Sequence, residues 1–176
     1  MKKILVSTFL FLAAQVVLVA DEVLADRTAI FPASMGEALV TAVCYDAPPK
    51  VEGYWTPSGS EVYEHVGRIE DALPRFVDSA RVRPKEWPCY LKQVAGIIVD
   101  GRQVLFVSYY FVGPKEMWPE DLRARREVCE SRGLEFDPDW WRKQPLTVED
   151  GGWLFFRVVY DTVAGEVIWY DENGNA

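Results

Sequence analysis

The chain has 176 residues, 49% of them hydrophobic, and its 27 acidic and 19 basic side chains give a formal net charge of -8. This charge disfavours a nucleic-acid backbone or an anionic membrane surface as partner, and it fits a cationic partner better. Acidity that only keeps an exported protein soluble gives the same composition and stays open as an explanation.

The first 25 residues have the pattern of an export signal. Lys2 and Lys3 precede a hydrophobic stretch that ends at Ala20, and Ala25 closes a Val-Leu-Ala tripeptide that suits cleavage by a signal peptidase. We therefore expect a signal peptide of residues 1–25. The mature chain, residues 26–176, is expected to be one domain in the periplasm or outside the cell, with no membrane contact after cleavage.

Two alternatives for this end of the chain stay open. Cleavage after Ala20 places Leu18 three residues before the bond, where a smaller side chain is preferred. An uncut leader would anchor the protein, since about 17 apolar residues are the lower limit for a helix that spans a bilayer.

The three cysteines are Cys44, Cys89 and Cys129. Disulfides persist outside the cytoplasm, so an odd number of cysteines predicts one bond and one remaining thiol. Spacing does not fix the pair. We expect Cys89 with Cys129, because both flank predicted elements and closing a loop of about 40 residues contributes roughly 4 kcal/mol.

The first half of the mature chain contains one clear helical pattern. Residues 34–44 suit a short helix, while residues 38–45 suit a strand, and both interpretations stay open. Residues 60–81 predict a helix that Pro74 kinks or divides. Its apolar residues recur at intervals of three and four: Val62, Val66, Ile69, Leu73, Phe76 and Val77.

Residues 90–112 contain the strongest local signal, two strand-like runs joined by Asp100-Gly101. This pattern predicts a β-hairpin of Tyr90–Val99 and Arg102–Val112 with a tight turn. Both faces of the second strand are apolar, which predicts a central strand covered on both sides. The faces are Val104, Phe106, Tyr110 and Val112 on one side, and Leu105, Val107, Tyr109 and Phe111 on the other.

Pro119–Arg132 predicts a second helix, with acidic residues in its first turn and Gly133 at its end. We interpret its arginines as part of a solvated surface, in preference to a basic binding site. They are Arg123, Arg125 and Arg126.

A second hairpin is predicted at the end of the chain, from Trp153–Asp161 and Glu166–Tyr170, after a candidate strand at Pro145–Glu149. Strands thus cluster after each helix. The order predicts an α+β domain, in which an antiparallel β-sheet of about 4–5 strands has two helices packed mainly on one face.

The last third of the chain has a distinctive residue pattern. It is Trp141-Arg142, Pro145-Leu146-Thr147-Val148-Glu149-Asp150-Gly151-Gly152, Phe155 to Tyr160-Asp161, Gly165 and Asn173-Gly174-Asn175-Ala176. This pattern resembles that of a group of uncharacterised small exported bacterial proteins. The similarity extends back through Tyr90–Phe111 and covers about half of the mature chain. It brings no activity, since none is known for the group.

The sequence contains no complete catalytic or metal-binding motif. It lacks a glycine-rich phosphate loop, a Gly-x-Ser-x-Gly elbow and a His-Glu-x-x-His pair, so we expect no cofactor and no metal. Asp171–Asn175 resembles a calcium loop only superficially, because its glycine comes too early. His65 is the only histidine, and its place on the apolar helical stripe favours a structural role.

The candidate binding residues are Trp140, Trp141, Asp137 and Asp139. Exposed indoles stack on sugars or anchor protein interfaces. Successive residues do not both face a core, so at least one of the two tryptophans is expected at the surface beside the aspartates.

Three functions fit these observations. A non-catalytic binding module of the inhibitor or immunity type would capture a cationic envelope protein or a glycan, and we favour it. An envelope glycan hydrolase would use paired carboxylates. A structural or assembly protein would pair through a sheet edge.

Overall fold

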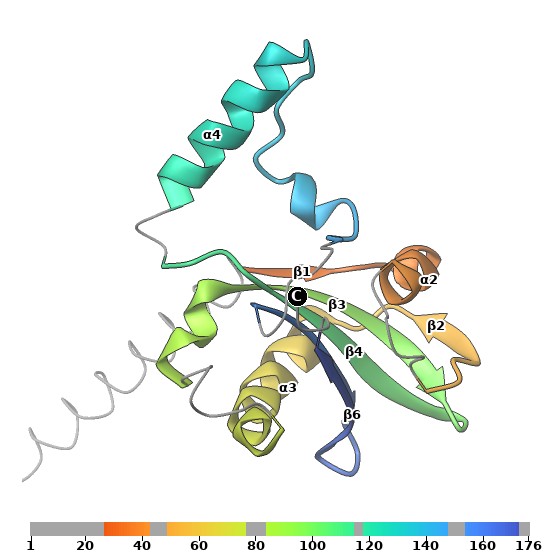
Figure 1. The fold of residues 1–176 in the computed structure, drawn as a ribbon. Coiled ribbons are helices and arrows are strands. Elements are labelled where there is room, and N and C mark those ends of the chain that lie inside the picture. Colours follow the sequence, from red (N-terminus) through yellow and green to blue (C-terminus); the bar gives the residue numbers. More distant parts are fainter. Residues whose placement is uncertain (1–26, 43–48, 77–83, 115–117, 148–153, 173–176) are drawn as a thin grey trace, which may run out of the picture.

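The computed structural model describes residues 27–42, 49–76, 84–114, 118–147 and 154–172 (Figure 1). Among these residues, no helix has both the length and the apolar character needed to cross a bilayer. The elements are β1 (Thr28–Ile30), α2 (Ala33–Thr41), β2 (Gly53–Trp55), α3 (Gly59–Ala72), η1 (Leu73–Arg75), η2 (Pro84–Cys89), β3 (Tyr90–Val99), β4 (Arg102–Phe111), α4 (Trp118–Ser131), η4 (Trp140–Arg142), β5 (Phe155–Asp161) and β6 (Glu166–Glu172).

The strands form one open six-stranded sheet, which confirms the α+β fold class. Its order is β1-β3-β4-β5-β6, and β2 also pairs with β3. Every described pair is antiparallel except β1 with β3, which is parallel. Of the candidate strand at 145–149, residues 145–147 are not in a strand and the other two lie outside the described residues.

The predicted β3–β4 hairpin is confirmed. Asp100 and Gly101 both have positive φ values, 49° and 71°, as a primed two-residue turn requires. The turn pairs Val99 with Arg102 and so fixes the register of the whole hairpin. The two faces of β4 divide as predicted, because the two sets of apolar residues belong to separate hydrophobic clusters.

Each face of the sheet has its own cover. Buried residues of α3 pack on one face, while α2 and residues near η4 pack on the other (Figure 1). Of the two helices predicted from the sequence, α3 covers one face of the sheet, whereas the second, predicted at residues 119–132, corresponds to α4, which projects from it (Figure 1). The other face is covered by α2 and residues near η4. Both faces need a cover because β3, β4 and β5 carry mostly apolar side chains on each side.

Helix α3 begins at a capping box. The Ser58 side chain accepts a hydrogen bond from the Glu61 backbone N–H, and the Glu61 side chain accepts one from the Ser58 N–H. The helix ends at Ala72, and Pro74 lies in the short η1 turn that follows, as the predicted division requires. His65 is buried with its ring 5.7 Å from that of Tyr160, which fits the expected structural role.

Two ion pairs are buried in the sheet and helix layers. The Lys92 ammonium lies 3.0 Å from the Glu70 carboxylate and so links β3 to α3. On the other face, the Arg157 guanidinium lies 2.6 Å from the Asp171 carboxylate, across β5 and β6. Asp171, the first residue of the superficial calcium-loop match, is therefore already engaged in a structural contact.

Candidate functional site

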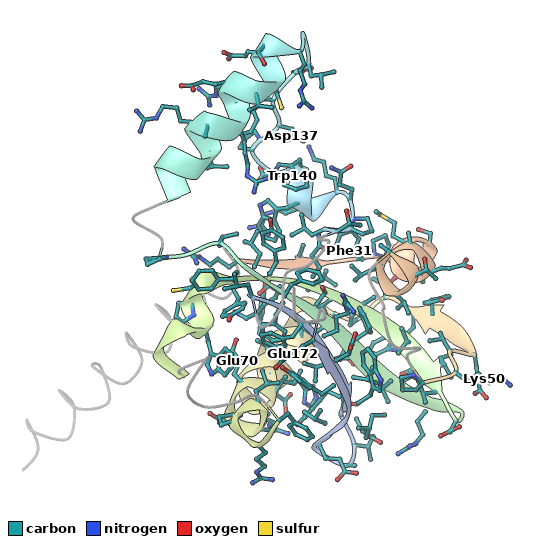
Figure 2. The ribbon with its side chains drawn as sticks, viewed as in Figure 1. Phe31, Lys50, Glu70, Asp137, Trp140 and Glu172 are labelled. Carbon is teal, nitrogen blue, oxygen red and sulfur yellow. The ribbon has the colours of Figure 1, made fainter. Side chains whose placement is uncertain are left out.

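Helix α4 and the segment that follows it project from the sheet (Figure 1). We call residues 118–144 the arm, and the sheet with α2 and α3 the body. Figure 2 shows Asp137 and Trp140 in the arm, apart from Glu70 in the body. No residue of α4 between 122 and 131 is buried. The arm is therefore attached to the body without a hydrophobic core of its own.

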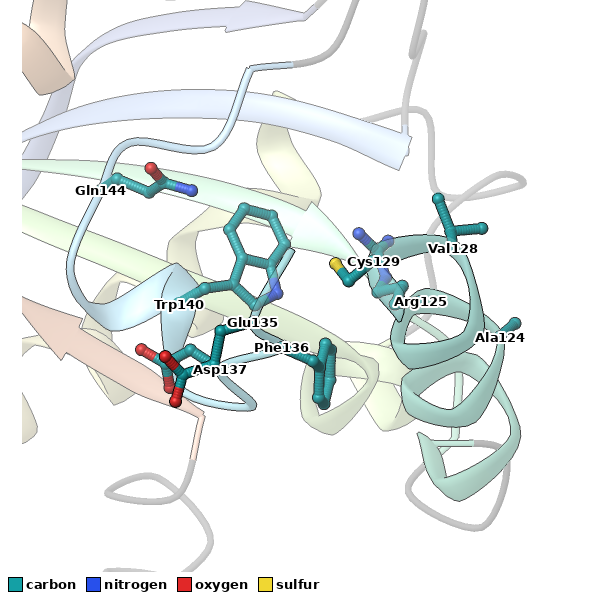
Figure 3. A pocket seen from close by; sticks show the side chains of 9 residues that line it. All are labelled: Ala124, Arg125, Val128, Cys129, Glu135, Phe136, Asp137, Trp140 and Gln144. Carbon is teal, nitrogen blue, oxygen red and sulfur yellow. The ribbon is translucent and has the colours of Figure 1, made fainter. Parts of the chain in front are cut away.

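A groove of ≈ 520 Å³ lies between the two halves of the arm (Figure 3). The Trp140 ring faces Arg125 and Cys129 of α4 across it (Figure 3). The wall from α4 is formed by Ala124, Arg125, Val128 and Cys129. The opposite wall is formed by Glu135, Phe136, Asp137, Trp140 and Gln144.

The groove exists because the chain reverses at Gly133. This residue has a φ of 68°, which glycine adopts without the strain that a side chain brings. The Leu134 N–H donates to the Cys129 carbonyl at 2.9 Å, and the Gly133 N–H donates to the Glu130 carbonyl at 3.0 Å. These bonds terminate α4 as the sequence predicts, and they direct the following segment back along the helix.

Two contacts between arginine and aromatic side chains join the halves of the arm. The Arg125 guanidinium lies 5.5 Å from the centre of the Trp140 ring, and that of Arg126 lies 5.4 Å from the centre of the Phe136 ring. Such contacts are worth about 0.5–1 kcal/mol each at exposed sites. Two of the three arginines that we expected to be simply solvated therefore hold the arm closed.

The base of the groove is fixed to the body through Gln93 on β3. Its amide nitrogen donates to the carbonyls of Trp141 and Gln144, at 2.5 and 2.8 Å, and its amide oxygen accepts from the Leu146 N–H at 2.8 Å. Gln93 is only 1% exposed, and its bonds to Trp141 and Leu146 form away from water. The Trp140 wall is thus bonded to the sheet through a buried side chain, whereas the α4 wall is joined to that wall by the two arginine–aromatic contacts.

The two predicted tryptophans have different roles. Trp141 is 3% exposed and packs in the hydrophobic cluster beneath η4, with the Arg142 guanidinium 4.2 Å from its ring centre. Trp140 is half-buried: it packs against the edge of the same cluster and also lines the groove. The expectation that neighbouring tryptophans would not both face inward is therefore met, and Trp140 is the one that a ligand can reach.

The two predicted aspartates also separate. Asp137 lines the groove, accepts a hydrogen bond from Lys143 at 2.5 Å and accepts one from the Asp139 N–H at 2.9 Å. The hydrogen bond from Lys143, followed by that from the backbone, lowers the pKa of Asp137. Asp139 does not line the groove, and its carboxylate lies 3.5 Å from the Arg142 guanidinium at the surface.

Sequence reasoning missed most of the groove. Val128 is 49% exposed although it is apolar, and Leu134 beside the groove is 58% exposed. Glu135 lines the groove and forms no ion pair within the described part of the chain. One sequence feature could have identified the α4 wall. Arg125, Val128 and Cys129 are three and four residues apart, which places them on one face of a helix.

The predicted disulfide between Cys89 and Cys129 is not formed in the structure. Neither cysteine forms a disulfide bond in the structure, and Cys44 lies outside the described residues. Cys89 closes η2 in the body, whereas Cys129 lines the groove of the arm. The arm places the two thiols on different parts of the fold, which sequence spacing does not reveal.

The groove has the chemistry of a binding site. Cys129 is its one thiol, and the histidine that would activate a thiol lies on α3 in the body. Across the described ranges, no group of three or more histidine, cysteine or acidic side chains is placed to hold a metal ion. The lining offers apolar surface, one indole and separate charges, which suit recognition.

Comparisons of the chain with protein-family profiles, curated proteins and solved structures find no match. The resemblance to small exported proteins therefore stays a prediction. Function has to be inferred from the groove itself.

Proposed function

We propose that the protein is exported and acts as a non-catalytic binding module that captures a cationic protein through the groove of its arm. The observation that carries this proposal is the 49% exposure of Val128 in the groove that half-buried Trp140 also lines, with Leu134, 58% exposed, next in sequence to the lining residue Glu135. Apolar side chains gathered in a groove lose their contact with water when a partner binds.

The charge of the chain favours a basic partner. The net charge is -8, and the removal of two lysines and two acids with residues 1–25 leaves it unchanged. Glu135 adds an acidic group at the groove, which Arg125 also lines, and forms no ion pair with a described basic side chain. A cationic surface would be attracted over a distance and would then find apolar contacts, which is the pattern of inhibitor and immunity proteins.

The glycan hydrolase is the less supported candidate. A hydrolase of this type needs one carboxyl group with a raised pKa as its general acid, but hydrogen bonding from Lys143 lowers the pKa of Asp137. Asp139 is outside the groove. Release of soluble wall fragments by the wild type, abolished in Asp137→Asn, would restore this candidate.

A matched pair of variants tests the binding function. Val128→Glu places a charge in the groove, and Val163→Glu places one on the β5–β6 turn, where Val163 is 91% exposed. In a pull-down from an envelope extract at low salt, the wild type and Val163→Glu should retain the same basic protein, and Val128→Glu should lose it. Recovery of nothing, or equal recovery by both variants, would contradict the proposal.

Export is tested separately by N-terminal sequencing of the native protein. Cleavage as proposed yields a chain that starts at Asp26 and is found outside the cytoplasm. A cytoplasmic product that starts at Met1 would remove this part of the proposal.

A further inference from the structure

A second, much smaller cavity lies between the arm and the sheet. Its volume is ≈ 20 Å³, and its walls come from both parts of the molecule. Leu91 and Tyr110 belong to the sheet, whereas Leu122 comes from α4. Apart from Arg125, the side chains around this inner cavity are apolar or aromatic.

The groove and the inner cavity share two lining residues, Arg125 and Trp140. The guanidinium of Arg125 lies over the Trp140 ring at 5.5 Å, so this contact separates the two spaces. Trp140 belongs to η4, whose backbone is bonded to Gln93, whereas Arg125 is a long side chain on a helix with no buried residue between 122 and 131. We therefore expect the Arg125 side of the partition to move more readily than the Trp140 side.

We propose that the groove and the inner cavity form one two-part site for a basic peptide segment that carries an aliphatic side chain. The aliphatic side chain passes between Arg125 and Trp140 and places its terminal methyl group against Leu91 and Tyr110. A lysine or arginine next to it in the segment pairs with Glu135. This inference rests on the proposed function and names the part of the partner that the groove recognises.

The size and polarity of the inner cavity determine the anchor. A volume near 20 Å³ accommodates about one methyl-sized group, so leucine, isoleucine or methionine fits where an aromatic ring does not. A sugar hydroxyl there would lose its bonds to water and find apolar walls, which disfavours a glycan. The acidic Glu135, which forms no ion pair with a described residue, favours the basic neighbour.

Synthetic peptides provide the probe. The first peptide has one leucine between two lysines in an alanine and serine chain, the second has serine in place of the leucine, and the third has glutamates in place of the lysines. Calorimetry with the processed protein should show that the second peptide binds at least about tenfold more weakly than the first, because a buried leucine is lost. The third should also bind more weakly. The first should slow alkylation of Cys129, which lines the groove.

Substitution of Arg125 distinguishes two roles for this side chain. It either blocks entry to the inner cavity until a ligand displaces it, or it only stabilises the arm. Arg125→Ala should tighten binding of the leucine peptide about two- to fivefold, because no contact with Trp140 has to be broken, and should leave the serine peptide unchanged. Arg123→Ala, an exposed position on the same helix, is the control and should change neither. A structural role for Arg125 would instead weaken all the peptides alike.

The acidic part of the site has its own pair of variants. Glu135→Gln should weaken binding of the first peptide, which has one leucine between two lysines, about two- to fivefold. Glu166→Gln, at an exposed position on β6, should leave this binding unchanged. Equal binding of the leucine and serine peptides, or uniform weakening by Arg125→Ala, would overturn the two-part site. The binding function would survive that result if Val128→Glu still abolished recovery of the basic protein.

Discussion

The body and the arm use aromatic side chains in opposite ways. In the body, aromatic rings pack on one another, as Tyr109 and Phe156 do with centres 4.6 Å apart. In the arm, Phe136 and Trp140 pack against arginines of a helix that has no buried residue between 122 and 131. The body is thus stabilised by burial, whereas the arm keeps apolar side chains such as Val128 and Leu134 exposed.

The joint between them is equally instructive. Arm residues next to η4 enter the hydrophobic cluster on one face of the sheet, and Gln93 bonds to three backbone groups there. Helix α4 contacts the other half of the arm through Arg125 and Arg126, and none of its residues between 122 and 131 is buried. We infer that α4 moves relative to the other wall of the groove while the body stays folded.

The largest difference between the regions should appear on core truncation. Phe156→Ala removes a fully buried ring that contacts Tyr109 and should lower the free energy of unfolding by about 3–5 kcal/mol. Val128→Ala in the arm should change it by about 0.5 kcal/mol or less. Urea unfolding followed by circular dichroism measures both. Similar losses would mean that the arm shares the core.

Substitution of Gln93 tests the joint. Gln93→Leu leaves buried backbone groups of Trp141, Gln144 and Leu146 without these partners and should lower the free energy of unfolding by about 2–3 kcal/mol. The tryptophan fluorescence of the folded state should also shift, as Trp140 becomes less fixed. Gln103→Leu, at an exposed position on β4, is the control and should do neither.

The same substitution at one glycine in the body and one in the arm introduces equal local backbone strain and so compares the two regions directly. Gly101 and Gly133 have φ values of 71° and 68°, and a Cβ at either position meets no neighbour, so replacement by alanine costs about 1 kcal/mol locally at each. Gly101→Ala should lower the free energy of global unfolding. Gly133→Ala should instead accelerate hydrogen exchange at the end of α4 and leave global unfolding unchanged. A matching global loss in both would show a cooperative arm.

A fall in pH should change the contributions of two carboxyl groups, Glu70 and Asp137, to the free energy of unfolding in opposite directions. Burial raises the pKa of Glu70 despite the nearby Lys92, so its contribution to stability is complete below its ordinary pKa and is lost as pH rises through the raised value. The pKa of Asp137 is lowered by Lys143, so its contribution is present above its ordinary pKa and is lost as pH falls through the lowered value.

Unfolding of Glu70→Gln and Asp137→Asn against the wild type, from about pH 3 to pH 7, measures these effects. As pH falls, the wild type should gain stability relative to Glu70→Gln and should lose stability relative to Asp137→Asn. Differences that run in the same direction for both variants would contradict the assignment.

Local pattern was sufficient for much of the body. The Asp100-Gly101 turn and the alternation along β4 identified the hairpin and both of its faces, because these features depend on neighbours in sequence. The pairing of β1 with β3 was not predictable, since a strand of three residues has no periodicity to read. Its partner is determined by contacts between distant parts of the chain.

The site shows the same limit. Of the four predicted binding residues, Trp140 and Asp137 line the groove. Trp141 and Asp139 do not, because the Trp141 backbone is bonded to Gln93 and the Asp139 carboxylate pairs with Arg142. The α4 wall of the groove was missed because a helix that lines a groove and an ordinary solvated surface helix have the same charged, amphipathic sequence pattern. The disulfide prediction failed because the separate position of the arm is a tertiary property.

Hydrogen exchange of the backbone amides, measured by mass spectrometry, tests most directly whether the arm opens while the body stays folded. Amides of α4 between 122 and 131 should exchange through local opening, at a free energy well below that of global unfolding, while those of β3, β4 and β5 should exchange only on global unfolding. Amides in α4 that are as strongly protected as those in β4 would contradict a movable arm.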